Sequence, residues 1–482
     1  MKTKSVEVKA AQNARAVEPE PSKQWDEALG PVLKNTPGFT KIFLDQLRRE
    51  RLTFGKRVHC PFLRPFFLSR ADEERVRRVA ETVAALAERV TATALKDNSL
   101  FTQFHLRPEE ERLARMKTGV GPVSTASRLD AFLLPGSLKF TEYNGESPAG
   151  AGYSETLSEI FRATPVMKEF AKTWEIHSYR LSSKLLDALV RTYLDWGGKT
   201  QRPQMAIVDW KEVPTWSEFE ILRERFEKLR VPVVLADPSE LDFDGKSLSA
   251  KGKKIDLVYR RVLINDIVAR PKECEALVNA YEAGATCVAN NFRCKVPHVK
   301  AFFAVLTDGK NAGLFSAEER DVIREHVPWT RAVEDVRSDY YGETIELLDY
   351  IRKKQETLVL KPSDEYGGTG VTLGWKVNAK EWERALQEAL PGGEKSKAHG
   401  CWIVQEKIAL RREPFPTIVR GGKVEMQDML VDFAPYLFNG KLAGFLTRLS
   451  TSDLANVTSG GGQIPSFRVE RKKARRRNAA GN

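Results

Sequence analysis

Leu358-Val-Leu-Lys361-Pro362-Ser-Asp-Glu-Tyr-Gly367-Gly368-Thr369-Gly370-Val371-Thr-Leu-Gly-Trp375 combines two apolar runs with a glycine-dense loop between them. The run that ends in Lys361 and Pro362 predicts a strand, and the run from Val371 predicts a second one. Glycines let backbone N–H groups approach an anion closely, and Lys361 adds a charge that suits phosphate. The stretch therefore predicts a loop that covers phosphates, although an ordinary hairpin with a flexible turn fits the loop alone equally well.

These glycines do not form the other familiar nucleotide motifs. A Walker loop needs a Lys-Ser/Thr pair after its last glycine and a helix behind it, whereas Val371-Thr-Leu follows here. A dinucleotide fingerprint needs a glycine turn that opens a helix. A protein kinase also joins two strands by a glycine loop, but neither His-Arg-Asp nor Asp-Phe-Gly occurs in the chain.

The composition is that of a globular protein. With 482 residues the chain is long enough for two or three domains. We expect a cytoplasmic location, because no apolar run approaches the length that spans a bilayer and the N-terminus lacks the apolar core of a signal peptide. The five cysteines include no Cys-x-x-Cys pair, so they predict neither a disulfide framework nor a zinc site.

Both ends of the chain are polar. Residues 1–24 include Glu18-Pro-Glu-Pro and predict a disordered leader. The net charge is +12, and seven Lys or Arg stand against Glu470 alone between Arg468 and Arg477. We interpret residues 468–482 as a solvated, disordered basic tail. A weak contact of this tail with nucleic acid or an acidic partner is the alternative, and it predicts steeply salt-dependent binding.

A hairpin is predicted around Pro135-Gly136-Ser137, which separates two β-type runs. Side chains alternate along a strand, so Arg128 and Asp130 share one face, and Glu142 and Asn144 share one face of the partner strand. Where these faces coincide, carboxylate and amide oxygens converge, and these are ligands for Mg²⁺. The alternative is a surface hairpin with charged outer residues.

Residues 205–262 predict a parallel sheet, because apolar strands alternate with a helical pattern. Ligands of such sheets collect at the carboxyl ends of the strands, where Arg260 and Arg261 lie. Either arginine could bind a carboxylate or phosphate, and at least one of them is expected to face solvent, since neighbours on a strand point to opposite sides.

Further positions complete the pattern. Arg293 and Lys300 lie where a strand leads into a helix, and Lys300 is either a phosphate ligand or a solvated lysine. The strand that ends in Gln405 and Glu406 offers an edge for adenine, or it is simply an amphipathic strand. Arg448 lies near the end of a strand in an antiparallel region whose hairpin signal is Asn439-Gly440.

Together these segments resemble the ATP-grasp superfamily in its circularly permuted form, the glutathionylspermidine synthase-like group. The motifs are Arg128-Leu-Asp130, Glu142-Tyr-Asn144, Leu360-Lys361-Pro362, Gly367 to Val371, and Val404-Gln405-Glu406. Glu142 precedes Lys361 in the chain, which is the order of the permuted group. The resemblance covers most of residues 60–467. No amidase domain is recognised, and no residues for glutathione or spermidine can be matched, so the substrates are not carried over.

The resemblance implies a mixed α/β and α+β fold, with a permuted ATP-grasp fold and a Rossmann-like pre-ATP-grasp domain. It implies a catalytic role for Arg128 and Arg448, and Mg²⁺ ligands in Asp130, Glu142 and Asn144. The expected units are the leader at 1–24, the Mg²⁺-binding strands at 25–200, the pre-ATP-grasp domain at 201–295, the nucleotide-binding part at 296–467 and the tail at 468–482. The expected ATP contacts are Lys300, Lys361, Gly367, Gly368, Gly370, Gln405 and Glu406, and the expected substrate contacts are Arg260, Arg261 and Arg293.

The implied activity is that of an ADP-forming ligase. ATP phosphorylates a carboxylate and ADP forms; an amine then attacks the acyl phosphate, phosphate leaves and an amide forms. An ATP- and Mg²⁺-binding scaffold or regulatory protein without turnover is the alternative. The expected cofactors are ATP and Mg²⁺, and the expected partners are a small carboxylate and a small amine, with no membrane. The sequence does not define these substrates, the pathway or the oligomeric state.

Overall fold

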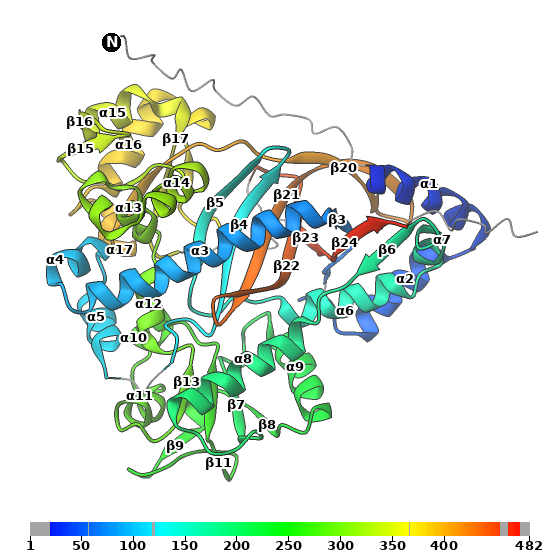
Figure 1. Cartoon of the computed structure of the whole chain (residues 1–482), viewed down its shortest axis with the longest axis horizontal. Coiled ribbons are helices and arrows are strands. Elements are labelled where there is room, and N and C mark those ends of the chain that lie inside the picture. The colour runs from blue at the N-terminus through cyan, green and yellow to red at the C-terminus, as the bar shows by residue number, and fades with distance from the viewer. Residues whose placement is uncertain (1–19, 56, 118–120, 366, 454–460, 473–482) are drawn as a thin grey trace, which may run out of the picture.

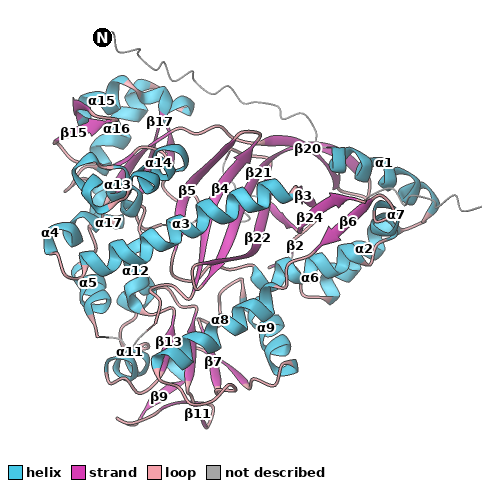
Figure 2. Cartoon of the chain, in the orientation of Figure 1, coloured by secondary structure: helices cyan, strands magenta, loops and turns pink. Residues whose placement is uncertain are grey.

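The computed structural model describes residues 20–55, 57–117, 121–365, 367–453 and 461–472. It has a mixed α/β architecture in which helices surround several separate sheets, as Figures 1 and 2 show. The long helix α3 (Arg70–Ala94) crosses the face of the largest sheet and contacts its strands. Ser69 caps this helix by accepting the N–H of Asp72 at 3.0 Å.

The largest sheet is antiparallel and carries the predicted hairpin. Its order is β23-β22-β21-β4-β5, and β20 pairs with one end of β21. Within the hairpin, Asp130 lies opposite Glu142 and Arg128 lies opposite Asn144, so the predicted pairing of these faces is confirmed. Every residue of β4 is buried, including its charged ones, which therefore need internal partners. The strands are β4 (Ala126–Leu134), β5 (Ser137–Asn144), β20 (Arg412–Ile418), β21 (Val424–Phe438), β22 (Lys441–Ser450) and β23 (Gly462–Ile464).

A four-stranded parallel sheet forms a second unit, as the sequence predicts. Its order is β13-β12-β7-β8, and both inner strands, β7 and β12, are buried along their whole length. The strands are β7 (Met205–Val208), β8 (Val233–Ala236), β12 (Leu257–Arg260) and β13 (Cys287–Ala289). The helices around them are α8 (Leu181–Trp196), α9 (Trp216–Lys228), α10 (Ile264–Ala269) and α11 (Glu275–Glu282), and a small β-meander, β9 (Leu241–Phe243), β10 (Leu248–Ala250) and β11 (Lys253–Lys254), lies at its edge.

A third, antiparallel sheet contains Lys361 and has the order β14-β19-β17-β18. Strand, glycine loop and strand follow one another as predicted, because β17 pairs with the short β18 beyond the loop. The strands are β14 (Thr330–Ala332), β17 (Leu358–Pro362), β18 (Thr372–Leu373) and β19 (Trp402–Glu406), beside the hairpin β15 (Arg337–Tyr340) and β16 (Glu343–Glu346). The helices are α12 (Lys295–His298), α13 (Ala301–Thr307), α14 (Ala317–His326), α15 (Leu347–Lys353), α16 (Ala379–Ala389) and α17 (Glu394–His399).

The two ends of the described chain correct the sequence predictions. Helix α1 (Glu20–Asn35) begins before residue 24, so the predicted leader is wrong for residues 20–24. Pro21 lies in its first turn, where a missing N–H costs nothing. Strand β24 (Ser466–Arg471) pairs with β3 (Phe66–Leu68) and β6 (Trp174–His177), so the predicted tail is wrong for 468–471. Residues 1–19 and 473–482 lie outside the described ranges.

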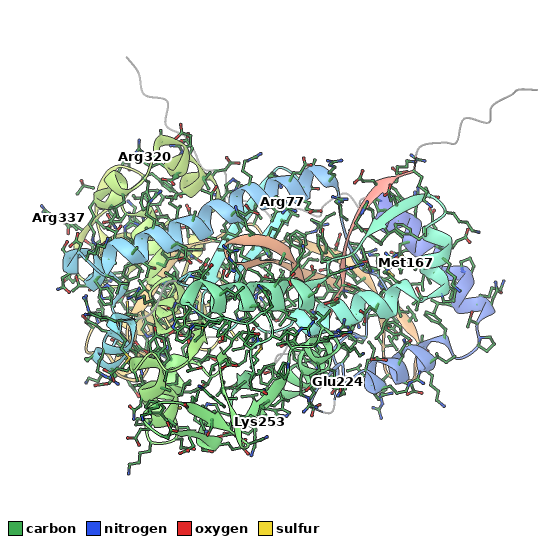
Figure 3. The ribbon with its side chains drawn as sticks, turned by 60° about the horizontal axis from the view of Figure 1, so that its bottom comes forward. Arg77, Met167, Glu224, Lys253, Arg320 and Arg337 are labelled. Atoms are coloured by element: carbon green, nitrogen blue, oxygen red, sulfur yellow. The ribbon has the colours of Figure 1, made fainter. Side chains whose placement is uncertain are left out.

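The remaining helices are α2 (Phe39–Arg49), α4 (Asn98–Phe101), α5 (Pro108–Arg115), α6 (Ala151–Arg162) and α7 (Pro165–Phe170). In the parts of the chain that the structure describes, no helix is both long and apolar enough to cross a bilayer. Even α3, with 25 residues, carries charge on its outer side, where Figure 3 labels Arg77.

Candidate active site

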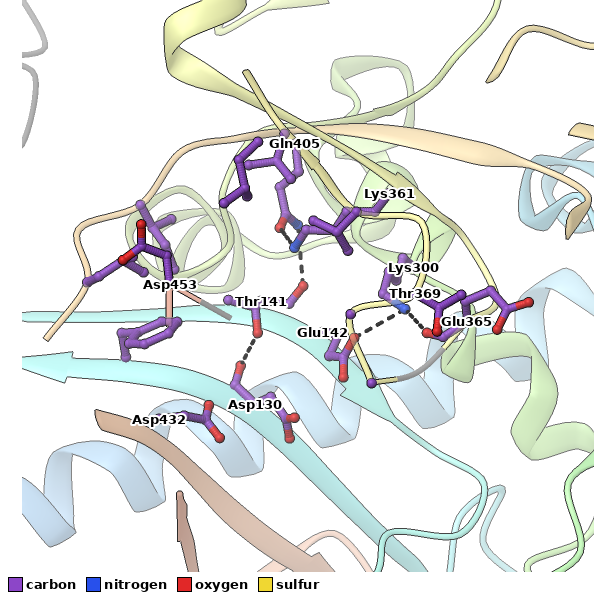
Figure 4. A pocket seen from close by; sticks show the side chains of 18 of the residues that line it. Asp130, Thr141, Glu142, Lys300, Lys361, Glu365, Thr369, Gln405, Asp432 and Asp453 are labelled. Atoms are coloured by element: carbon purple, nitrogen blue, oxygen red, sulfur yellow. Dashed lines mark hydrogen bonds and ion pairs between the residues drawn. The ribbon is translucent and has the colours of Figure 1, made fainter. Parts of the chain in front are cut away.

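A cavity of about 170 Å³ lies between the β17 and β19 strands on one side and the β4–β5 hairpin on the other (Figure 4). Acidic and basic side chains from both sheets face it. Beside them, apolar side chains form a slot, and the glycine loop closes one wall. The charged lining includes Asp130, Glu142, Asp432, Lys300, Lys361 and Arg448, the slot contains Phe132, Val359, Leu373, Trp375, Ile408 and Leu410, and the loop contributes Gly367, Gly368 and Thr369.

Asp130 is the centre of a buried ionic cluster. Arg128 donates to both of its carboxylate oxygens, at 2.7 and 3.1 Å. Arg448, from β22, donates to Asp130 and to Asp432, each at 2.5 Å. Two guanidinium groups thus face two carboxylates, which balances the charge that burial would otherwise penalise.

The two carboxyl groups of this cluster have different pKa values. Burial tends to raise the pKa of Asp130, but Arg128 and Arg448 hold it well below its usual range. At Asp432 burial prevails over Arg448 and raises the pKa to about 6. Asp130 is therefore held as a carboxylate, whereas burial makes the Asp432 carboxylate easier to protonate.

Glu142 and Lys300 form the second charged pair of the cavity. Their carboxylate and ammonium groups are 3.2 Å apart, and the Asn144 amide donates to Glu142 at 3.1 Å. Burial raises the pKa of Glu142, yet Lys300 and Lys361 lower it by more, so it lies below its usual value. Asn144 is not among the residues that line the cavity and acts here as a support for Glu142.

Lys361 lies at the end of β17 and donates to the Gln405 side chain at 2.7 Å. Gln405 in turn donates to the Thr330 hydroxyl at 3.1 Å, which fixes its orientation. Burial, reinforced by Lys300 and opposed by Glu142, lowers the pKa of Lys361 to about 8. Lys361 therefore remains mainly charged at neutral pH and points at the cavity from the sheet opposite Glu142.

The apolar slot ends at Glu406 on β19. Its carboxylate accepts the hydroxyls of Tyr340 at 3.0 Å and Tyr341 at 2.9 Å, both from the β15–β16 hairpin. These contacts fix the Glu406 side chain at the rim. A flat apolar slot with a strand edge at its rim is the environment that a nucleobase requires.

The glycine loop has backbone angles that only glycine adopts readily. The φ angles are +67° at Gly367, +78° at Gly368 and +73° at Gly370. A Cβ atom at Gly370 would also lie 3.0 Å from the Trp402 ring. The loop conformation therefore depends on these glycines, as expected for a loop that presents backbone N–H groups.

Three predicted substrate residues lie elsewhere. Arg260 and Arg261 are both buried, so the prediction that one of them faces solvent is wrong. Arg260 pairs with Glu146 at 3.2 Å, and Arg261 donates to the carbonyl of Pro148 at 2.9 Å. Arg293 donates to the carbonyl of Met116 at 3.4 Å. None of the three lines the cavity.

The sequence interpretation missed several residues of the site, including Asp432, Trp375 and the two tyrosines that hold Glu406. Asp432 had a signal, because it is the one acidic residue in the apolar run Met429 to Phe438 of a strand. The oxygen donors of Asp130, Glu142 and Asp432 face one cavity, and this donor set fits Mg²⁺, a hard cation that takes oxygen ligands.

No family model matches the chain, and no curated protein sequence matches it. The chain is similar to the solved structure of a glutathione synthetase-like effector from Globodera pallida, at a TM-score of 0.57. The two sequences are 12% identical, and the match covers 94% of this chain and 100% of the effector. Two further structures are too distant to carry an argument. They are a gamma-glutamylcysteine synthetase-like protein from Methylobacillus flagellatus (12% identity, 79% of this chain and 86% of that one, TM-score 0.38) and D-alanyl-alanine synthetase A from Vibrio cholerae (9%, 48% and 68%, 0.26).

The chain therefore shares its fold with the glutathione synthetase-like effector. This agrees with the ATP-grasp-type fold that the sequence motifs imply, at the level of the fold.

Proposed function

We propose that the protein is an ADP-forming carboxylate–amine ligase of the circularly permuted, glutathionylspermidine synthase-like type. The observation that carries the proposal is one cavity that brings Lys300, Lys361 and Arg448 together with carboxylates, Asp130, Glu142 and Asp432 among them, beside an apolar slot. The chain order supports the permuted type, because the strand of Glu142 precedes that of Lys361. Its substrates are a small carboxylate and a small amine.

Each charged residue has a role in this proposal. Lys361, Lys300 and the N–H groups of the glycine loop neutralise and orient the phosphates of ATP. Glu142, Asp130 and Asp432 are the residues available to hold Mg²⁺, which would supply charge neutralisation between phosphates, and Asn144 supports Glu142. Arg448 lies beside these carboxylates and stabilises negative charge on the acyl phosphate, and Arg128 positions Asp130.

Binding requires the ion pairs of the cavity to exchange. Lys300 contacts Glu142 and also donates to the backbone carbonyl of Glu365 at 2.6 Å, at the base of the glycine loop. When phosphates bind the ammonium of Lys300 in place of Glu142, the carboxylate of Glu142 becomes available to a cation. Because the ion pairs exchange partners, each charged group keeps an opposite charge beside it, which limits the cost of desolvating it.

A thermal-shift titration with a non-hydrolysable ATP analogue tests the nucleotide site. With Mg²⁺ and analogue at a hundred times its dissociation constant, the protein is expected to gain about 2.7 kcal/mol. Failure of the analogue to stabilise the protein at any Mg²⁺ concentration would contradict the proposal. ADP release with pairs of carboxylates and amines then separates a ligase from an ATP-binding scaffold, which binds the analogue but shows no turnover with any pair.

The affinity for the analogue is expected to fall as the pH rises from about 7 to about 9, because Lys361, with a pKa of about 8, loses its proton. A charged contact contributes roughly 1.5–3 kcal/mol, but the protonated fraction falls only about tenfold across this range, so the affinity falls by about tenfold at most. Calorimetric titration across this range measures it. Lys361→Met serves as the control, because this variant is expected to bind the analogue weakly at every pH and to show no fall in affinity between these values. If the affinity of the variant falls as it does in the wild type, a group other than Lys361 titrates.

A further inference from the structure

A buried lysine outside the cavity joins the segments that build it. The side chain of Lys295, at the start of α12, is 1% exposed. Its ammonium lies 2.6 Å from Asp364, 3.1 Å from Glu146 and 3.6 Å from Glu110, and it also donates to the side-chain oxygen of Asn265. Four separate segments therefore meet at one cation.

Two of these segments continue directly from the strands of the proposed site. Asp364 is the second residue after β17, between Lys361 and the glycine loop, and Glu146 is the second residue after β5, which carries Glu142. Glu110 and Asn265 lie on α5 and α10, which pack against each other, and α5 also packs against α12 (Figure 1). Lys295 thus couples the base of the loop to the end of the hairpin.

The base of the loop also contacts the start of α13. The N–H of Lys300 donates to the carbonyl of Ser363 at 2.8 Å, and that of Ala301 donates to the Ser363 hydroxyl at 3.1 Å. Lys300 also holds the carbonyl of Glu365. Of the three residues Ser363, Asp364 and Glu365, Asp364 is the one whose side chain pairs with Lys295. Lys295 in turn pairs with Glu146 at the end of the hairpin.

A metal ion does not explain this cluster. Ligand atoms of Glu146, His298 and Asp364 do lie within 4.8 Å of one another. However, the ammonium of Lys295 already lies among them, and burial lowers its pKa less than Glu146 and Asp364 raise it, so the pKa lies above its usual value. The cation of this cluster is the lysine itself.

We propose that Lys295 is a positioning residue that fixes the base of the glycine loop relative to the strand of Glu142, so that both sides of the nucleotide site keep their spacing. The proposal rests on the proposed function of the cavity. Lys295 and Asp364 do not line the cavity, so their effect on nucleotide binding is indirect.

Asp364→Asn is the decisive variant, because it removes the charge that ties the loop base to Lys295 with little risk to the fold. Three carboxylates (Glu110, Glu146 and Asp364) face two cations (Lys295 and Arg260), so removing one negative charge leaves two against two. We expect the dissociation constant of the Mg²⁺–ATP analogue to rise about tenfold, and the loop at 363–371 to become more susceptible to proteolysis, while the unfolding temperature stays close to that of the wild type.

Asp26→Asn is the matched control. Asp26 pairs with the fully buried Arg64 near α1, at the end of the molecule away from the loop (Figure 1). This variant is expected to lower stability and to leave nucleotide affinity unchanged. Lys295→Arg keeps the charge and is expected to bind the analogue within a few-fold of the wild type.

The outcomes separate the two proposals. Wild-type protein that does not bind the analogue contradicts the nucleotide site itself. Wild-type affinity in Asp364→Asn, or an equal loss of affinity in Asp26→Asn, overturns the positioning role while leaving the proposed function intact. The positioning role is supported when Asp364→Asn binds the analogue more weakly while Asp26→Asn and Lys295→Arg keep an affinity close to that of the wild type.

Discussion

Glu142→Gln is expected to remove the Mg²⁺ dependence of analogue binding and to lower ADP formation by roughly 10- to 150-fold, the equivalent of a contact worth about 1.5–3 kcal/mol. Glutamine keeps the size of the side chain and its contact with Asn144, but it loses the charge that attracts a divalent cation. Without the negative charge of Glu142, the positive charges of Lys300 and Lys361 are less neutralised, so the phosphates of the analogue still bind without metal. Thermal shift with and without Mg²⁺ measures the first effect, and ADP release measures the second.

Glu425→Gln provides the matched control for this variant. Glu425 is an exposed glutamate on β21 of the same sheet, outside the cavity lining, so the same change of charge there is expected to leave Mg²⁺ dependence and turnover unaltered. A Glu142→Gln protein whose analogue binding still requires Mg²⁺ to the wild-type extent would remove Glu142 from the set of metal ligands.

Local patterns were sufficient to predict the strands that carry the site. The apolar run before Lys361, the glycine loop after it and the Pro135-Gly136-Ser137 turn are signals within a few residues. Strand alternation placed Arg128 with Asp130 on one face and Glu142 with Asn144 on one face of the partner strand, and the structure shows that these faces coincide. The parallel sheet was predicted for the same reason, since strand and helix periodicities alternate along the chain.

Long-range contacts explain what the sequence could not predict. Strand alternation indicates that Arg260 and Arg261 point to opposite sides, but β12 is an inner strand covered on both faces, so neither side is solvent. Their acidic partners, Glu146 and Glu218, are distant in sequence. Near the C-terminus the basic composition led to the prediction of a disordered tail that includes the end of strand β24. Phe467 and Val469 are buried in this strand, and the charged residues alternate with them.

Arg448→Met is expected to abolish ADP formation and to cost about 3–5 kcal/mol of stability, because removing one partner of a buried ion pair leaves the other unpaired. Asp130 keeps Arg128, but Asp432 loses the guanidinium that contacts it, and its pKa, already raised to about 6, rises further. Chemical denaturation measures the loss of stability. An active variant would exclude Arg448 from the chemistry.

The double variant Arg448→Met/Asp432→Asn separates stability from catalysis. One guanidinium, on Arg128, then faces one carboxylate, on Asp130, so charge balance returns and most of the lost stability is expected to return with it. Activity is not expected to return, because the guanidinium of Arg448, which is proposed to stabilise the acyl phosphate, is still missing. Recovery of both together would mean that Arg448 serves only to compensate the charge of Asp432. Recovery of stability alone would mean that catalysis requires Arg448, Asp432 or both.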